Sequence, residues 1–181
     1  ANTTGSYNTA SGMYALKSTT TGYQNTASGY SALKLNTTGT NNVASGSKAL
    51  QNNTTGNNNV ASGYQALFSN TTGYNNTAYG YTAMQDNTTG INNTASGMYA
   101  LQNNTTGTLN TASGWYSLYA NTSGTKNIGL GSGAGDAITT GSNNTIIGDY
   151  AGTTTLANTV VIAAGTTERL KIDASGMQVN G

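Results

Sequence analysis

The sequence predicts an all-β fold, a β-solenoid (parallel β-roll) with about one coil per 17 residues. Glycine recurs every 17 residues in two phased series, one from Gly5 to Gly141 and one from Gly12 to Gly165. The shared unit reads N-T-T-G-x-x-N-T-A-S-G-x-x-A-L-x-x, and its Thr, Asn and Gly residues make poor helix interiors. Seventeen residues are also too few for the paired helices of helical repeats, which need about 33 or more. One β coil per unit is the remaining option.

Each coil is expected to hold short strands, such as Asn42–Ser45 and Ser47–Leu50 in the third unit. The turns between them would use Gly and Asn where the backbone needs a positive φ. Successive coils would stack as parallel strands roughly 4.8 Å apart, so that about ten coils make a rod on the order of 50 Å long.

Stacking places each residue above its equivalent in the next coil, so every column must tolerate contact with itself. Asn does so through side-chain amide hydrogen bonds, and Thr over Thr is expected to work likewise. No column is charged, and the Asn-Thr-Thr segments such as Asn36-Thr37-Thr38 are interpreted as turns. The predicted structural ladder consists of Asn8, Asn25, Asn42, Asn59, Asn76, Asn93, Asn110, Asn127 and Asn144.

The apolar columns predict a thin core of one Leu and two small residues per coil. Burial of apolar surface contributes roughly 25 cal/mol per Å², whereas ordering the chain costs about 1–2 kcal/mol per residue. An isolated stack is therefore marginal, and we expect association around a long symmetry axis to supply further burial.

The sequence pattern of the repeat changes at Ile128. Residues 1–127 are predicted to form the regular solenoid, and residues 128–165 to form variant coils richer in β-branched residues. The step from Asn144 to Asn158 is 14 residues, which indicates that these later coils are shorter.

Residues 166–181 are predicted to form a terminal β-hairpin or connector. Arg169–Asp173 and Met177–Val179 would pair around Ala174-Ser175-Gly176. Terminal repeats commonly differ from the others because an open sheet edge must be capped or continued.

Composition excludes several classes of partner. The net charge is +1 and the lysines are widely spread, so the chain has no electrostatic footprint for nucleic acid and no polybasic membrane patch. No stretch approaches the run of about 18 apolar residues that membrane insertion needs. The chain lacks Cys and therefore has no disulfide framework. It begins at Ala1 without a signal peptide, so we expect a fragment or a processed product.

The residues needed for most enzymatic sites are missing. The chain has no His and no Cys, which removes the usual metal ligands, thiol nucleophiles and histidine bases. Among the five acidic residues, Asp136 and Asp149 are about one coil apart and could face each other, as a glycosidase pair would require. The glycines of Gly129–Asp136 lack the strand-to-helix context of a phosphate loop. We predict no catalytic residue, no metal and no cofactor, and hence no enzyme.

Aromatic residues fill parts of two adjacent columns of the repeat. Tyr and Trp provide rigid amphipathic contact area, which suits either packing between coils and chains or contact with sugars. Both interpretations stay open at this point. The candidate receptor-contact residues are Tyr30, Tyr64, Tyr81, Trp115 and Tyr116.

Four segments resemble known fibrous proteins. NTASGYSAL (Asn25–Leu33) and NVASGYQAL (Asn59–Leu67) resemble the repeats of bacteriophage tail fibres. NTIIGDYAG (Asn144–Gly152) is similar to the coils of trimeric autotransporter adhesin heads, although the present coil is longer. ERLKIDASGMQVNG resembles the segment that, in such fibres, precedes a self-cleaving endosialidase-type intramolecular chaperone. The resemblance implies a parallel homotrimer of left-handed β-rolls. The sequence departs from such fibres in having no chaperone domain, which fits either a fragment or a mature product trimmed after folding.

The function we expect is that of a shaft segment in a phage tail fibre, located on the virion or another extracellular surface. Its partners would be two further copies of itself, other fibre or virion proteins, and a host cell-surface glycan or protein. Two alternatives stay open, namely a bacterial trimeric surface adhesin and a monomeric ice-binding β-solenoid. The last rests on the recurring Thr-Thr pairs, although an ice-binding face favours Thr-x-Thr, which points both hydroxyls to one side.

Overall fold

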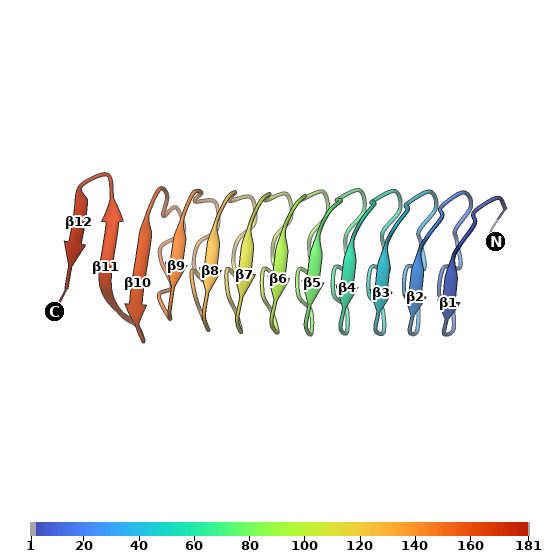
Figure 1. Ribbon diagram of the computed structural model, residues 1–181, viewed down its shortest axis with the longest axis horizontal. Coiled ribbons are helices and arrows are strands. Elements are labelled where there is room, and N and C mark those ends of the chain that lie inside the picture. The colour runs from blue at the N-terminus through green and yellow to red at the C-terminus, as the bar shows by residue number, and fades with distance from the viewer. Residues whose placement is uncertain (1–2, 181) are drawn as a thin grey trace.

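The computed structural model of the chain describes residues 3–180 as an all-β solenoid of about nine coils (Figure 1). Twelve strands form one sheet whose spatial order follows the sequence from β1 to β12. Strands β1 to β10 pair in parallel, and β11 and β12 continue the sheet as antiparallel strands. The strands are β1 Thr9–Ser11, β2 Thr26–Ser28, β3 Val43–Ser45, β4 Val60–Ser62, β5 Thr77–Tyr79, β6 Thr94–Ser96, β7 Thr111–Ser113, β8 Ile128–Leu130, β9 Thr145–Ile147, β10 Val160–Ala164, β11 Thr167–Asp173 and β12 Gly176–Val179.

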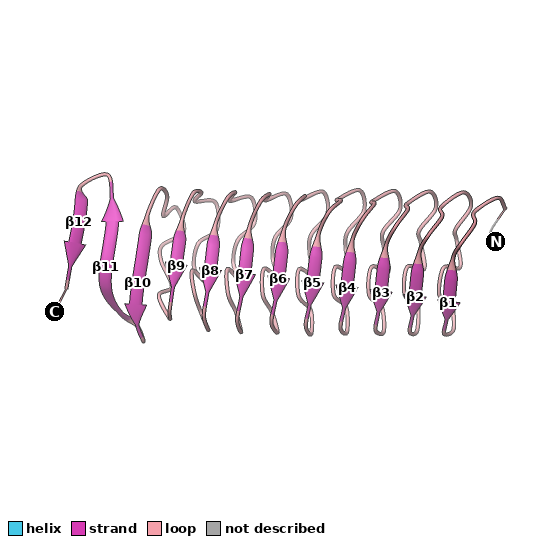
Figure 2. Cartoon of the chain, in the orientation of Figure 1, coloured by secondary structure: helices cyan, strands magenta, loops and turns pink. Residues whose placement is uncertain are grey.

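Each regular coil holds one three-residue strand, and the remainder of the coil consists of turns and bends (Figure 2). The predicted strand at Asn42–Ser45 is present as β3, but the predicted strand at Ser47–Leu50 is wrong. Lys48 and Leu50 have φ values of 62° and 50°, and this left-handed conformation is incompatible with an extended strand. The turns still bond from coil to coil, since Leu50 N–H donates to the Ala66 carbonyl at 3.0 Å. Residues 3–180 contain no helix, so none is available that is long and apolar enough to cross a membrane.

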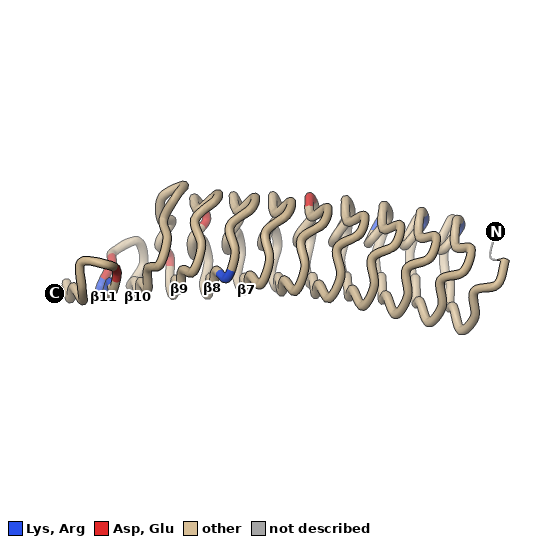
Figure 3. The backbone as a smooth tube through the Cα atoms, turned by 90° about the horizontal axis from the view of Figure 1, so that it is seen from above, with Lys and Arg blue, Asp and Glu red and all other residues tan. Residues whose placement is uncertain are grey.

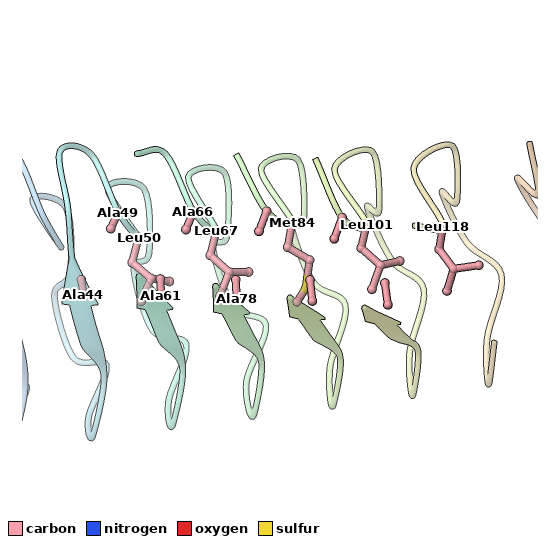
Figure 4. Packing of buried hydrophobic residues seen from close by; sticks show 14 of the residues in the cluster. Ala44, Ala49, Leu50, Ala61, Ala66, Leu67, Ala78, Met84, Leu101 and Leu118 are labelled. Carbon is pink, nitrogen blue, oxygen red and sulfur yellow. The ribbon is translucent and has the colours of Figure 1, made fainter. Parts of the chain in front are cut away.

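The core runs along the inside of the solenoid, and each regular coil contributes a few small or apolar side chains to it. The central Ala of every strand from β2 to β7 points inward, and the following turn contributes a second small residue and one Leu or Met. Figure 4 shows Leu50, Leu67, Met84, Leu101 and Leu118 in line, and all five are fully buried. The predicted thin core is therefore complete within one chain, and the Leu column is not a surface on which copies could associate.

The glycine that follows each short strand permits the sharp exit into the turn. Gly80 has a φ of 135°, a conformation that side chains rarely adopt. A Cβ placed on Gly80 would lie 2.5 Å from the carbonyl oxygen of Gly97 in the next coil. Both the backbone conformation and the close coil-to-coil approach therefore require glycine at this position.

The coils after β8 change their core. Gly135 takes the place of the Leu, and Ile138, Ile146 and Val161 fill the interior instead. The later step in the repeat is 15 residues, because Thr159 N–H, rather than a group of Asn158, donates to Asn144 Oδ1 at 3.1 Å.

Asn158 stacks on Asn143 outside the core, with Asn143 Nδ2 donating to Asn158 Oδ1 at 3.0 Å. The predicted 14-residue step aligned two Asn residues that belong to different columns. The error arose because the sequence has Thr159 where earlier coils have the ladder Asn.

The predicted hairpin at the end of the chain is present as β11 and β12. These strands extend the sheet past the last coil, and no return segment lies behind them (Figure 3). One side of the hairpin is polar, with a 3.2 Å ion pair between Lys171 and Asp173. Asp173 Oδ1 also accepts hydrogen bonds from the Ser175 hydroxyl and backbone N–H. Figure 3 further shows that charged residues are sparse along the rod.

Candidate functional site

Aromatic side chains gather along one edge of the rod, in the turn that follows each strand. The second residue after the glycine that follows each strand has a positive φ, as in Tyr99 (62°) and Tyr116 (57°). The first residue is exposed where it is aromatic, whereas the second is buried where it is small, as in Ser31 and Thr82. We call this set the aromatic edge, which consists of Tyr64, Tyr81, Tyr99, Trp115, Tyr116 and Tyr119.

The rings of the aromatic edge form one connected row over four coils. Tyr64 and Tyr81 stack with centroids 5.2 Å apart, and Tyr81 meets Tyr99 edge to face at 5.7 Å. Tyr99 lies 4.8 Å from Tyr116. Tyr116 contacts Trp115 at 4.3 Å and Tyr119 at 4.6 Å. The row is still open to solvent, because Tyr64, Tyr81 and Trp115 are 40%, 46% and 52% exposed.

Four of the five candidate contact residues therefore lie together, and Tyr30 lies apart. Tyr30 contacts Tyr14 at 5.8 Å near the N-terminal end, and Ser47 and Lys48 occupy the two columns in the coil between the two groups. The prediction missed Tyr99 and Tyr119. Tyr99 lies in the same column as Tyr116, and Tyr119 lies three residues after Tyr116 in the same turn, so both positions carried a signal.

The same turns carry polar groups beside the rings. Gln102 Nε2 donates to Gln85 Oε1 at 3.2 Å, and burial raises the pKa of the neighbouring Asp86. Partial burial also raises the pKa of Tyr116, and the nearby Tyr119 and Tyr99 hydroxyls raise it further. The Tyr116 phenol is therefore a neutral hydrogen-bond donor at neutral pH. Aromatic planes with amide and hydroxyl donors are suited to contact with sugar rings.

The predicted Asn ladder runs through the interior as a continuous set of amide contacts. Asn59 is typical, because its backbone N–H donates to Asn42 Oδ1 at 3.0 Å and its own Oδ1 accepts from Asn76 N–H at 3.0 Å. The members from Asn25 to Asn144 are fully buried, whereas the terminal Asn8 is partly exposed. Their bonds hold coils together and leave no amide open to a ligand.

A second buried Asn ladder was not predicted. Asn70 Nδ2 donates to Asn53 Oδ1 at 2.8 Å and to the Gly73 carbonyl at 3.0 Å. The sequence signal was present, since this Asn also recurs every 17 residues, but it was assigned to turns alone. The ladder consists of Asn36, Asn53, Asn70, Asn87, Asn104 and Asn121.

The Thr column bonds differently from the expected side-chain ladder. The hydroxyl of Thr54 donates to the backbone carbonyl of Thr71 at 3.0 Å, and the backbone N–H of Thr54 donates to the same oxygen. The pattern repeats through successive coils, as in Thr37 and Thr88. These hydroxyl protons are therefore used inside the rod.

The acidic residues Asp136 and Asp149, about one coil apart in the sequence, come close to each other. Both carboxylates lie beside Gly133, and burial together with Asp149 raises the pKa of Asp136. Among residues 3–180, however, no three acidic side chains gather as they would to hold a metal ion.

The outward face of the sheet is the second extended surface of the rod. Residues on either side of the central strand position point away from the core, as Thr26 and Ser28 do in β2. Across β1 to β7 this face carries mainly Thr and Ser, and across β8 to β12 it becomes apolar.

Comparison of the chain with protein-family models, with curated proteins and with solved structures finds no match.

Proposed function

We propose that the chain is a shaft segment of a bacteriophage tail fibre, assembled as a parallel homotrimer of left-handed coils and joined to other fibre or virion proteins. The observation that carries this proposal is the set of bonded columns along the rod. Two Asn ladders, the Thr-to-carbonyl bonds and the strand pairs each join one coil to the next. The resemblance of Asn25–Leu33 and Asn59–Leu67 to phage fibre repeats supports the assignment to such a fibre.

Such columns favour a stiff spacer. Bending the rod would stretch several hydrogen bonds in the same coil interface at once, and each buried bond that is left unmade costs about 1–3 kcal/mol. A repeat protein of this kind also contacts only neighbouring units, so its length is set by the number of coils.

The aromatic edge is proposed to contact a host cell-surface glycan. Exposed rings on successive coils give a sugar chain several stacking positions, and Gln85 and Gln102 offer amide groups beside them. A protein receptor on the same host surface is the other partner that such a ring row suits.

The chain offers its own reporter for this contact, because Trp115 is its single tryptophan. Titrating oligosaccharides of the host cell surface should shift the Trp115 emission in a saturable way. Tyr81→Ala should weaken the response, while Tyr74→Ala, which removes an equally exposed tyrosine from another column, should leave it unchanged. An emission that no host oligosaccharide shifts, with host-cell binding unaffected by Tyr81→Ala, would remove the receptor role and leave the shaft role.

A bacterial trimeric surface adhesin is the nearest alternative, since it would use the same rod and the same rings. Antibody labelling distinguishes the two locations. Labelling of virion tails supports the fibre, and labelling of the bacterial envelope supports the adhesin.

One observation favours the ice-binding alternative on a different surface from the Thr-Thr pairs. Thr26 and Ser28 in β2, and Thr94 and Ser96 in β6, point outward from the sheet in a Thr-x-Ser arrangement. Hydroxyls on this face are about 7 Å apart along a strand and roughly 4.8 Å apart between coils. An ice-growth assay tests it, and Thr94→Lys should abolish any thermal hysteresis that the chain produces.

A further inference from the structure

The outward face of β8 to β12 is a continuous apolar surface, which we call the C-terminal apolar face. Residues paired directly across neighbouring strands point to the same side of a sheet. The pairs Leu130 with Ile147, Ile147 with Ile162, and Ile172 with Met177 therefore share one face. Its most exposed members are Leu130, Ile147, Ile162, Ile172, Met177 and Val179, which are between 39% and 71% exposed.

This face differs sharply from its continuation along β1 to β7. There the equivalent outward residues are Thr or Ser, apart from Val43, Val60 and Tyr79. The C-terminal apolar face carries no charged side chain among its paired outward positions from β8 to β10. Replacing outward Thr and Ser by Ile, Leu, Val and Met does not stabilise a surface that stays in water, but it does stabilise a surface that is buried against a partner.

The hairpin shows which side of the sheet is meant to meet water. Lys171 and Gln178 are paired on the side opposite the C-terminal apolar face, as is the ion pair of Lys171 with Asp173. Beyond the last coil, no other segment of residues 3–180 covers either side of β11 and β12 (Figure 1). The polar side suits solvent, and the apolar side has no partner within the described part of its own chain.

We infer that the C-terminal apolar face packs against further copies of the same chain, parallel and in register. This inference rests on the self-association in the proposed function, and it assigns the surface that performs it. Parallel copies around a common axis would bring Ile162 to the height of Ile162, as stacked coils already bring Leu to Leu. A closed, symmetric arrangement of this kind repeats one contact in every protomer.

The size of the surface also favours a second copy over an unrelated compact partner. Five strands span only about 20 Å, and a partner confined to them would bury much less than the roughly 800 Å² per side of a stable interface. A straight, parallel copy would continue its contact along β1 to β7, where the outward Thr and Ser residues lie in the same line. The apolar strands β8 to β12 would then supply most of the apolar contact of a longer interface.

The absence of Cys from the sequence allows a direct test by cross-linking. Ile162→Cys should form an intermolecular disulfide under mild oxidation at micromolar protein concentration. Thr55→Cys, in an exposed turn outside the sheet, is the matched control and should stay reduced. Equal cross-linking of both variants, or none at position 162, would overturn the inference.

A second measurement distinguishes failure of this surface from failure of the proposed self-association. Ile162→Lys combined with Ile172→Lys should lower the solution mass from three times 18.3 kDa to a single chain mass. The circular dichroism spectrum should still be that of a β protein. Thr55→Lys combined with Thr89→Lys, two exposed positions in turns outside the sheet, should keep the full assembly. A double variant that stays trimeric would place the interface elsewhere, and an unmodified chain that is monomeric would overturn the self-association as well.

Discussion

Removing one amide from the buried Asn ladder should destabilise the whole rod measurably, and Asn59→Ala is the sharpest case. Asn59 Oδ1 accepts the backbone N–H of Asn76 at 3.0 Å. Its Nδ2 donates to the Gly73 carbonyl at 2.9 Å and to Asn42 Oδ1 at 3.2 Å. Alanine removes all three bonds from a site that water does not reach.

The cost follows from which groups lose their last partner. The Gly73 carbonyl still accepts from Asn70 Nδ2 at 3.0 Å, and Asn42 Oδ1 still accepts the backbone N–H at position 59 at 3.0 Å. Only the Asn76 N–H is left buried without an acceptor, which costs about 1–3 kcal/mol. With the void left by the amide, we expect Asn59→Ala to lower the free energy of unfolding by about 2–4 kcal/mol.

Urea unfolding followed by circular dichroism measures this loss, at one fixed protein concentration because association changes apparent stability. Asn52→Ala is the matched control, since the Asn52 side chain makes no hydrogen bond with the described residues and is only partly buried. Asn8→Ala, at the partly exposed end of the ladder, should cost clearly less than Asn59→Ala. A difference below about 0.5 kcal/mol between Asn59→Ala and Asn52→Ala would refute the reasoning, because that is the size of a neutral surface change.

Three further changes test other parts of the coil. Gly80→Ala should cost at least about 3 kcal/mol or prevent folding, because its Cβ would lie 2.5 Å from Gly97 O at a φ of 135°, and urea midpoints measure it. Leu67→Ala should cost about 3–5 kcal/mol in the same assay, because it empties a fully buried core position. Burial and Asp149 raise the pKa of Asp136, so the folded chain holds that proton more tightly than the unfolded chain. Stability from this group is therefore full below the unfolded pKa of about 4 and falls as pH rises through the raised folded pKa, a slope that Asp136→Asn should flatten in midpoints from pH 3 to 7.

Each of these changes has a control and a contradicting outcome. Gly165→Ala keeps a positive φ but meets no neighbour within 4 Å, so a loss as large as that of Gly80→Ala would rule out the coil contact as the cause. Met84→Leu restores the residue found in neighbouring coils and should change stability by less than about 1.5 kcal/mol. Asp149→Asn should reduce the pH slope in part, and a slope that survives in Asp136→Asn must come from another group.

The sequence allowed the period, the Ala–Leu core and the first Asn ladder to be predicted, because each follows from a residue that recurs in one column. Asn59 and Leu67 could be placed inside the rod from spacing alone. Spacing does not report backbone conformation, however. The predicted strand Ser47–Leu50 was wrong because Lys48 and Leu50 adopt a left-handed backbone that neither residue type favours, and only the stacked coils impose it.

The sequence also did not show which way a side chain points when the residue type suits a turn. Asn36 begins an Asn-Thr-Thr segment that suits a turn, and only the bond of Asn53 Nδ2 to Asn36 Oδ1 at 2.9 Å reveals the second ladder. The aromatic edge was found in part. Tyr64, Tyr81, Trp115 and Tyr116 were predicted from adjacent columns, Tyr99 was left out although it shares the Tyr116 column, and Tyr119 lies in neither column.

The C-terminal apolar face could not be predicted from the residue types. Ile128, Ile146, Ile147 and Ile162 look alike in sequence, yet Ile146 fills the core while the other three point outward. The difference depends on strand register, because a shift of one residue moves a side chain to the opposite face.

The solution mass of the unmodified chain tests the central claim most directly, namely that this rod associates in parallel with further copies of the same chain. Light scattering over a hundredfold range of concentration should give three times the 18.3 kDa chain mass, with little dissociation on dilution. A folded chain that stays at 18.3 kDa throughout would contradict the claim, and would make the outward Thr and Ser face and its ice-growth assay the next subject of study.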